Sequence, residues 1–257
     1  MRRDIQFAVV VWVLITLAAM AVTYFVMDPF PTIGAEEADF IDEAFMIMTY
    51  MAAPVFAIVM TILIWGVPRW RTRGNRDPPP EDGPAILGTN WFPRFWFVVT
   101  AALAVVVMIY PGLTGIAELR SDNTADFRVE MTGLSWQWLV TYPDHESIRL
   151  SSGAGDELVL PEDTRIQFDV TALDVLHSFW IPAFRQKIDA VPGQTTVIYT
   201  TTAGTGSFED DVAYRVQCAE LCGLNHATMS MNVRVVSHEE FQSWLASKGA
   251  TAAKVSN

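Results

Sequence analysis

Several features common in membrane and redox proteins are scarce or absent in this sequence. Its 257 residues include only two cysteines and four histidines. No Cys-x-x-Cys-His segment occurs, which excludes a fused c-type haem domain. There is no glycine-rich nucleotide-binding loop and no internal repeat. Beyond residue 117 there is no long apolar run, so we expect the rest of the chain to be a water-soluble domain.

Basic residues are also scarce in that second part. From residue 121 to 257 there are 18 acidic and 9 basic residues, a difference of −9. Nucleic-acid binding requires basic patches, so we expect no nucleic-acid partner. The acidity indicates either an ordinary soluble surface or a surface that attracts a basic partner and speeds the encounter.

Three long uncharged runs occupy the first part. They extend over Ile5–Met27, Ala44–Val67 and Phe95–Ala117, each long enough to cross a bilayer as a helix. Pro54 lies within the second run, and a spanning helix tolerates proline when neighbours re-satisfy the freed carbonyl. The sequence therefore predicts a membrane anchor over residues 1–117, with helices at about 5–27, 44–67 and 95–117.

A signal peptide is the alternative for the first run, because Arg2 and Arg3 precede it and Ala19-Met20-Ala21 resembles a cleavage site. The length of the run favours a retained span.

The distribution of arginines predicts the orientation. Arginines precede the first run and follow the second, at Arg2, Arg3, Arg69, Arg71, Arg73 and Arg76. The segment between those runs has six acidic residues and no basic one. The positive-inside rule thus places the N-terminus in the cytoplasm and residues from about 118 outside. Pro78–Gly83 is expected to be a stiff connector.

The sequence predicts that the second part is an all-β domain over residues 118–250, followed by a tail at 251–257. Alternating or β-branched runs recur between turn residues, and the spacing is typical of a sandwich or small barrel. A capping box at Ser237–Glu240 predicts a closing helix. The expected strands are Phe127–Met131, Leu134–Tyr142, Glu157–Leu160, Arg165–Thr171, Thr195–Thr202, Val212–Gln217 and Met231–Val236.

Both cysteines fall in one window with other metal-ligand residues. Cys218 and Cys222 precede His226 and Met229, and His177 lies upstream. Two thiolates, two imidazoles and a thioether form a soft ligand set that suits copper. The alternatives are a disulfide, which three intervening residues make geometrically demanding, and tetrahedral zinc, in which methionine has no role. A single blue copper would leave one thiolate idle, so two metal ions fit better.

The pattern Cys-x-Glu-Leu-Cys-Gly-x-x-His-x-x-Met after Asp-Val-x-His-Ser-Phe resembles subunit II of the haem–copper cytochrome c oxidases. The resemblance covers roughly residues 38–247. It implies a cupredoxin-like sandwich/barrel carrying a binuclear copper centre, CuA, in a bacterial plasma membrane with the copper domain on the periplasmic side. The roles it implies are bridging thiolates at Cys218 and Cys222, one copper each for His177 and His226, a weak thioether ligand at Met229, a weak carbonyl ligand at Glu220, and a Mg²⁺ ion held by the Glu220 carboxylate at the interface with subunit I.

An aromatic run, Gly133–Tyr142, resembles the family's aromatic segment. By that match Trp136 is the exposed indole through which the electron enters, whereas Trp138 packs in the core. The alternative is that both rings share one strand face and pack. Gln137 stands where the family has tyrosine, and Asp174 matches an acidic position near the docking face, with an ordinary surface aspartate as the alternative.

The resemblance implies an electron-transfer subunit of a respiratory oxidase. Its partners would be subunit I, with the haems and the second copper site CuB, subunit III, membrane lipid, and a cytochrome c or blue copper donor. Four histidines are too few to hold the oxygen-reducing site as well. The alternative is a membrane-tethered copper electron carrier or copper chaperone. This chain departs from the family in its third span and in lacking an acid near Arg94; His145 and His238 are expected at the surface.

Overall fold

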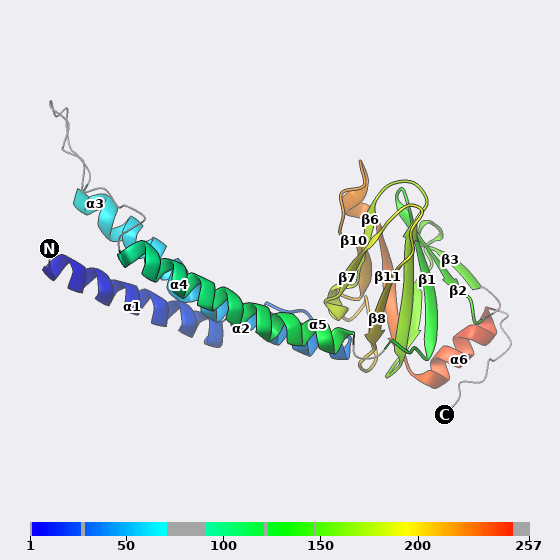
Figure 1. The fold of residues 1–257 in the computed structure, drawn as a ribbon. Coiled ribbons are helices and arrows are strands. Elements are labelled where there is room, and N and C mark those ends of the chain that lie inside the picture. Colours follow the sequence, from blue (N-terminus) through cyan, green and yellow to red (C-terminus); the bar gives the residue numbers. More distant parts are fainter. Residues whose placement is uncertain (1, 27–28, 71–90, 121–122, 146–147, 249–257) are drawn as a thin grey trace. The chain divides into compact units, whose positions relative to one another are not determined.

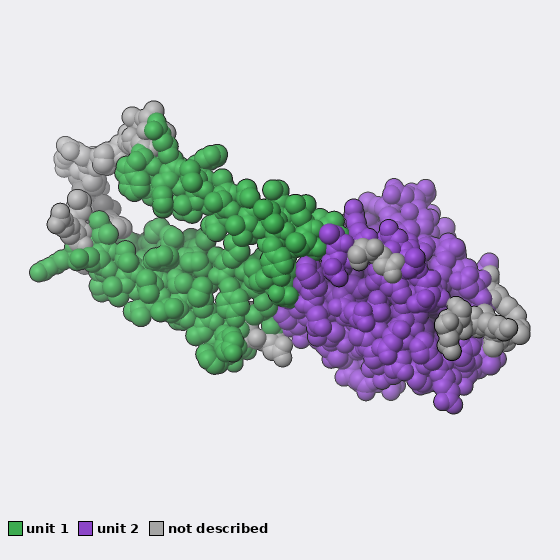
Figure 2. All heavy atoms as spheres, turned by 60° about the horizontal axis from the view of Figure 1, so that its bottom comes forward, with its two compact units in different colours: residues 1–29, 43–116 green, residues 30–42, 117–257 purple. Residues whose placement is uncertain are grey.

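The computed structural model describes residues 2–26, 29–70, 91–120, 123–145 and 148–248. The chain divides into two compact units, one of residues 1–29 and 43–116 and one of residues 30–42 and 117–257 (Figure 2). The predicted arginines 71, 73 and 76, the connector Pro78–Gly83 and the tail 251–257 lie outside the described residues.

The first unit is helical. Helix α1 spans Arg2–Phe25, and α2 spans Glu36–Thr61 and continues through η1 (Ile62–Gly66) into α3 (Val67–Trp70). Helix α4 spans Trp91–Val107 and continues through η2 (Met108–Leu113) into α5 (Thr114–Leu119). Within the described residues, three helices are long and apolar enough to cross a membrane. The prediction of three such helices is confirmed, and their orientation stays a prediction.

Helix α1 packs on α2. The Trp12 indole Nε1 donates to the Pro54 carbonyl at 2.8 Å, and the rings of Phe7 and Trp65 lie 4.3 Å apart. On α2, Ala57 is fully buried, as expected where small residues let two spanning helices approach closely. These contacts make α1 part of the helical unit.

The segment before the second span belongs to the second unit. Gly34 donates its amide to the Ala183 carbonyl at 2.9 Å, and Ala35 forms a β-bridge with Thr202. The start of α2 is held by ion pairs of Asp42 with Arg185, at 2.8 Å, and of Glu37 with Arg165. The structure therefore divides the chain differently from an anchor that runs unbroken over residues 1–117.

The second unit contains two β-sheets (Figure 1). The five-stranded sheet has the order β3 (Ile148–Ser151), β2 (Gln137–Tyr142), β1 (Phe127–Leu134), β5 (Arg165–Ala172), β8 (Thr196–Thr201). The six-stranded sheet has the order β4 (Leu158–Pro161), β11 (Ser230–Val236), β10 (Arg215–Cys218), β6 (His177–Trp180), β7 (Lys187–Ala190), with β9 (Gly206–Ser207) beside β11. Two pairings, β1 with β5 and β4 with β11, are parallel.

One apolar core joins the two sheets. Side chains alternate between buried and less buried along β1 and β2, so Met131, Trp138 and Tyr142 point inward and are fully buried. Phe179 of the other sheet lies in the same core, with its ring centroid 4.9 Å from that of Phe168. The expected fold class, a helical anchor with an all-β cupredoxin-like sandwich, is confirmed.

Seven of the observed strands were predicted, and each predicted strand end lies within three residues of the observed one. The sequence missed β3, β6, β7 and β9, each of four residues or fewer, which are too short to show a period of two. Helix α6 (His238–Ser247) closes the chain as predicted, and the Ser237 hydroxyl accepts from the Glu240 amide at 3.3 Å.

The prediction that His145 lies at the surface is wrong. His145 is 5% exposed, and its ring centroid lies 5.2 Å from that of Phe127 and 6.2 Å from that of Phe241 on α6. Its Nδ1 has no hydrogen-bond partner among the described residues. Aromatic side chains from a strand and a helix that are far apart in the sequence bury His145. The residues next to His145 in the sequence could not reveal this burial. His238 is exposed, as predicted.

Burial lowers the pKa of His145, and the neighbouring Asp144 only partly opposes this. The unfolded chain therefore binds a proton near the ordinary value of about 6.5, whereas the folded chain does not. We expect the contribution of His145 to stability to be fully present above about pH 6.5 and to be lost as the pH falls from there through the folded-state pKa. His145→Phe should remove this part of the pH dependence. The check is the thermal unfolding midpoint of both proteins across this range; parallel curves would contradict the prediction.

Candidate metal centre

Strand pairing brings two distant parts of the sequence to one end of the sandwich. Strand β6 begins at His177, and β10 ends at Cys218, which is paired with Phe179 of β6. The Cys218 amide donates to the Met229 carbonyl at 3.1 Å and so closes the loop between β10 and β11. This loop and α6 lie at opposite ends of the sandwich (Figure 1).

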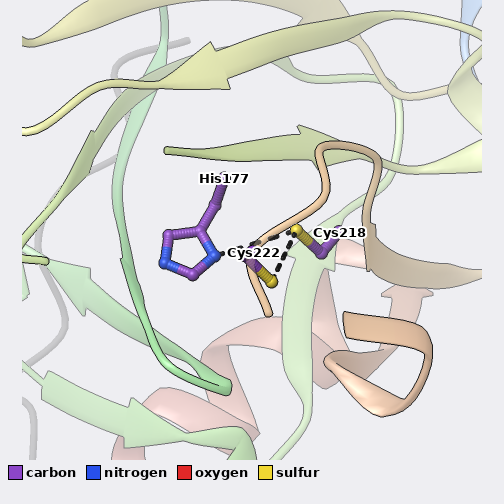
Figure 3. Close-up of side chains that lie close together, drawn as sticks. All are labelled: His177, Cys218 and Cys222. Carbon is purple, nitrogen blue, oxygen red and sulfur yellow. Dashed lines mark hydrogen bonds between the residues drawn. The ribbon is translucent and has the colours of Figure 1, made fainter. Parts of the chain in front are cut away.

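The two sulfurs form the centre of the cluster. Cys218 Sγ and Cys222 Sγ lie 3.7 Å apart, and both cysteines are free thiols. His177 Nδ1 lies 3.8 Å from Cys218 Sγ (Figure 3). The donor atoms of these three buried residues lie within 4.8 Å of one another, an arrangement that could hold a metal ion.

Three further donors flank the sulfur pair. On the Cys222 side, His226 Nδ1 lies 3.7 Å and Met229 Sδ 3.8 Å from Cys222 Sγ. On the Cys218 side, the thiol lies 3.2 Å from the carbonyl oxygen of Glu220. Thiols, imidazoles and a thioether are the ligands that copper prefers over hard cations, so the residues present fit the predicted metal. The structure brings together all six predicted donors.

Three neighbours hold the His177 ring. Asp174 Oδ1 lies 2.9 Å from His177 Nε2, and Asp174 Oδ2 accepts from the Ser135 amide at 2.8 Å. The indole of Trp138 meets the imidazole edge-on, with centroids 6.2 Å apart. A Cβ on Gly133 would lie 2.8 Å from His177 Cδ2, so a side chain there would displace the ring.

The hydrogen bond to Asp174 also selects the tautomer. Burial opposes ionisation of Asp174, but hydrogen bonds from Ser135 and His177 outweigh it and hold its pKa well below the ordinary value. An ionised carboxylate only accepts, so His177 Nε2 carries the ring proton and Nδ1 is free for a metal. Carboxylates that fix a ligating histidine in this way are common behind metal sites.

The surroundings of Cys222 disfavour the charged thiolate form of its side chain. Burial, with the Cys218 thiol as the next cause, raises the pKa of the Cys222 thiol to about 12. The Cys222 thiol therefore stays protonated at neutral pH unless a cation is bound. A coordinated metal deprotonates such a thiol outright, so metal loading should release protons.

Trp136 connects this cluster to the surface. Its side chain lies in the turn before β2 and is 37% exposed, and Nε1 donates to the Cys222 carbonyl at 3.1 Å. Gly223 follows with a φ of 113°, in the left-handed region that favours glycine, and its Cβ position is 3.4 Å from the indole. Trp138, in contrast, is fully buried, as predicted.

Sequence reasoning missed two contributors. Gly133 was part of the aromatic segment, but only the approach of β6 shows why it must lack a side chain. Asp174 is exposed and its carboxylate contacts His177, a role that the sequence did not predict; its place near a docking face stays a prediction. The spacing Asp174-x-x-His177 was the available signal, but it needs a backbone turn to bring the groups together.

The fold and the cluster define a β-sandwich domain with a group of side chains that could hold a metal ion, in a chain with helices of membrane-spanning length. Residues 152–236, which include all six donors, match the family model described as the periplasmic domain of cytochrome c oxidase subunit II. This part of the chain is therefore similar to the periplasmic domain of that family.

Curated relatives carry the similarity over more of the chain. A probable cytochrome c oxidase subunit 2 of Rickettsia bellii is 29% identical over 226 residues, which are 82% of this chain and 80% of the relative. Cytochrome c oxidase subunit 2 of Thermostichus vulcanus is 28% identical over 275 residues, 86% of this chain and 79% of the relative. Among solved structures, the periplasmic domain of Bradyrhizobium japonicum oxidase subunit II is 34% identical, with 49% of this chain and 95% of that chain covered at a TM-score of 0.44.

Proposed function

We propose that this chain is the electron-accepting subunit of a respiratory haem–copper oxidase. It takes single electrons from an outer donor, a cytochrome c or a small blue copper protein, at a binuclear CuA centre. It passes them to haem in subunit I, where oxygen is reduced and protons are pumped. The observation that carries the proposal is the convergence of two thiols 3.7 Å apart with two imidazoles, a thioether and a carbonyl.

The arrangement suits two metal ions sharing the sulfur pair. His177 and the Glu220 carbonyl lie on the Cys218 side, and His226 and Met229 lie on the Cys222 side. Two bridging thiolates with one imidazole at each end would hold two coppers, which when bound supply one-electron storage shared between both ions. His177, Met229 and both cysteines are buried, which favours electron transfer over binding of a substrate at the metal.

The electron enters in this proposal through Trp136. Its ring is both exposed and hydrogen-bonded to the backbone of the ligand Cys222, so a single contact joins the surface to the cluster. Two flanking side chains of the ligand loop, Leu221 and Leu224, are 77% and 89% exposed. Exposed aromatic and apolar side chains are features of surfaces on which a partner protein docks.

The remaining assignments follow the same family match. The Glu220 side chain is exposed and would hold Mg²⁺ at the contact with subunit I. The N-terminus would lie in the cytoplasm of a bacterium and the β-domain in the periplasm, with subunits I and III beside the helices in the lipid. Residues 1–117 without the segment 30–42 would form the anchor, and residues 118–250 with that segment would form the copper domain.

Purification of the full chain in mild detergent tests this function. We expect it to co-purify with a haem-bearing membrane subunit, and to show purple and near-infrared absorption with an electron-spin signal shared over two copper nuclei. A fully metallated chain that purifies alone without haem would instead support a tethered copper carrier or chaperone. One copper per chain, or zinc alone, would rule out the binuclear centre.

Replacing Met229 by leucine should raise the reduction potential and leave both coppers bound. Met229 is fully buried, and leucine has a similar volume, so the loop should keep its packing. Loss of a weak thioether donor destabilises the more positive oxidised state, and axial ligands tune copper potentials in this way. The potential is measured by spectroelectrochemical titration. Met231→Leu, a buried methionine of β11, is the matched control, and an equal shift in both variants would contradict the role of Met229.

A further inference from the structure

The stretch between the first two long helices, residues 30–42, is built into the β-sandwich unit, and we call it the interspan segment. Its backbone contacts the sandwich closely: a Cβ on Gly34 would lie 3.0 Å from the Cβ of Ala183. Its carboxylates also bind to the sandwich, because Glu37 accepts from the Thr201 amide of β8 at 3.0 Å. The segment is therefore part of the fold of this unit and not a simple connection.

One guanidinium group holds both ends of the interspan segment. The Arg185 side chain is only 8% exposed, and its Nε and Nη2 donate to the two carboxylate oxygens of Asp42 at 2.8 and 2.9 Å. At the other end of the segment, Nη2 donates to the Pro31 carbonyl at 2.6 Å and Nη1 to the Thr32 carbonyl at 3.3 Å. Nη1 also donates to the Pro182 carbonyl at 2.9 Å. Each of the five N–H groups of the guanidinium thus has an acceptor within reach.

The backbone of Arg185 adopts a conformation that is unfavourable for a residue with a side chain. Arg185 follows the 3₁₀ helix η4 (Pro182–Phe184) with a φ of 63°, in the left-handed region that favours glycine. Such a conformation persists only where the surroundings hold it. Glycine would remove the strain together with the guanidinium. An arginine here therefore indicates that its side-chain contacts outweigh the backbone strain.

The contact lies where the chain passes between the two compact units. Asp42 and Glu43 are neighbours in α2, but Asp42 belongs to the β-sandwich unit and Glu43 to the helical unit. With the interspan segment bound, the chain connects the units at three places, after residues 29, 42 and 116. If the segment detached, it would be a loop between the first two helices. The sandwich would then be connected to the helices only by the chain after residue 116.

We propose that Arg185 is a latch that holds the interspan segment on the β-sandwich. When the latch is closed, the sandwich keeps all three connections to the helices. When it is open, the interspan segment leaves the sandwich and only one connection remains. The latch does not depend on the proposed electron transfer, because none of its residues is a candidate metal donor.

Hydrogen exchange of the full chain, in the complex in which it purifies, tests the latch. Arg185→Lys keeps the charge but loses the planar fork, whereas Arg185→Gly relieves the backbone and loses the side chain. We expect the amides of the interspan segment to exchange about tenfold faster or more in both variants, because removing one partner of a buried ion pair is strongly destabilising. Mass spectrometry of peptides measures the rates. Peptides from β1 and β10 should exchange as before, since the opening is local.

Two control variants separate the latch from general effects. Arg128→Lys changes an arginine that also pairs with an aspartate, Asp169, but does not contact the interspan segment. Asp163→Gly relieves the other non-glycine residue with a positive φ among the described residues. Both controls should leave the exchange of the segment unchanged.

A double variant tests whether Arg185 and Asp42 act through one contact. Arg185→Lys combined with Asp42→Asn should exchange no faster in the interspan segment than the faster single variant, because both changes break the same pair. Effects that multiply would contradict the latch. Unchanged exchange of the segment in either Arg185 variant would overturn it, as would an equal increase in every peptide of the sandwich, which would assign Arg185 to the stability of the whole domain.

Discussion

Replacing Cys222 by serine should abolish the two-copper centre. The Cys222 sulfur lies within 3.8 Å of three other donor atoms, on Cys218, His226 and Met229, so its loss removes a contact to each of them. A hydroxyl is a harder and far less acidic ligand than a thiol and cannot bridge two soft ions. We expect the variant to bind at most one metal ion per chain. Replacing a residue that only supports a metal ligand typically lowers metal affinity by about 10–100-fold, and we expect a larger loss here because the ligand itself is removed.

Copper content, the near-infrared band and the electron-spin signal measure this loss. Cys218→Ser should have the same effect, because both sulfurs are shared in the proposed centre. Thr228→Ser is the matched control on the same loop: its hydroxyl bonds only the Asn225 carbonyl, at 3.1 Å, and contacts no sulfur. Two coppers with a shared spin signal in either cysteine variant would refute the bridging role. The thermal unfolding of the metal-free variants shows whether the sandwich still folds.

Replacing Trp136 by phenylalanine should slow electron acceptance while copper stays bound. Phenylalanine keeps an exposed ring for a donor to dock on, but it lacks the Nε1–H that bonds the Cys222 carbonyl at 3.1 Å. We expect a loss on the order of 100-fold at saturating donor, the scale on which misplacing a reacting contact slows an otherwise intact site. Trp136→Ala should also raise the donor concentration needed for half-maximal rate, because the docking surface itself is removed.

Rapid-mixing reduction of the copper centre by cytochrome c and by a blue copper protein measures both effects. Trp244→Phe, on α6 at the opposite end of the sandwich, is the control and should leave the rate unchanged. If Trp136→Phe transfers electrons at the original rate, the electron does not enter through this indole. Repeating the series across salt concentration shows whether the acidic surface attracts the donor, since screening weakens such attraction.

The donor set of the site was predictable because four of its six members carry soft-donor side chains in one short pattern. Cys218, Cys222, His226 and Met229 occupy twelve residues, and chemistry alone makes that set unusual. The strand that carries His177 was not predicted, because β6 has only four residues and its burial comes from both neighbours. The prediction that His145 lies at the surface was wrong for a similar reason, because residues distant in sequence determine its burial.

Other features depended on elements that meet only in three dimensions. The requirement for glycine at position 133 arises because β1 passes His177, and Asp174 acts on that ring through a turn. The segment 30–42 joins the sandwich through ion pairs with Arg165 and Arg185, more than 120 residues away. A local reading assigned it to the anchor because it lies between two apolar runs.

By itself the sequence determined the helices of spanning length, the all-β character of the second part and the chemical identity of the candidate metal ligands. These follow from local quantities: the length of uncharged runs, the alternation of side chains and the softness of donor atoms. Tertiary structure alone decided which nitrogen of His177 faces the sulfurs and how Trp136 reaches the cluster. Each of these depends on distances between residues far apart in the chain, which only the packed sheets determine.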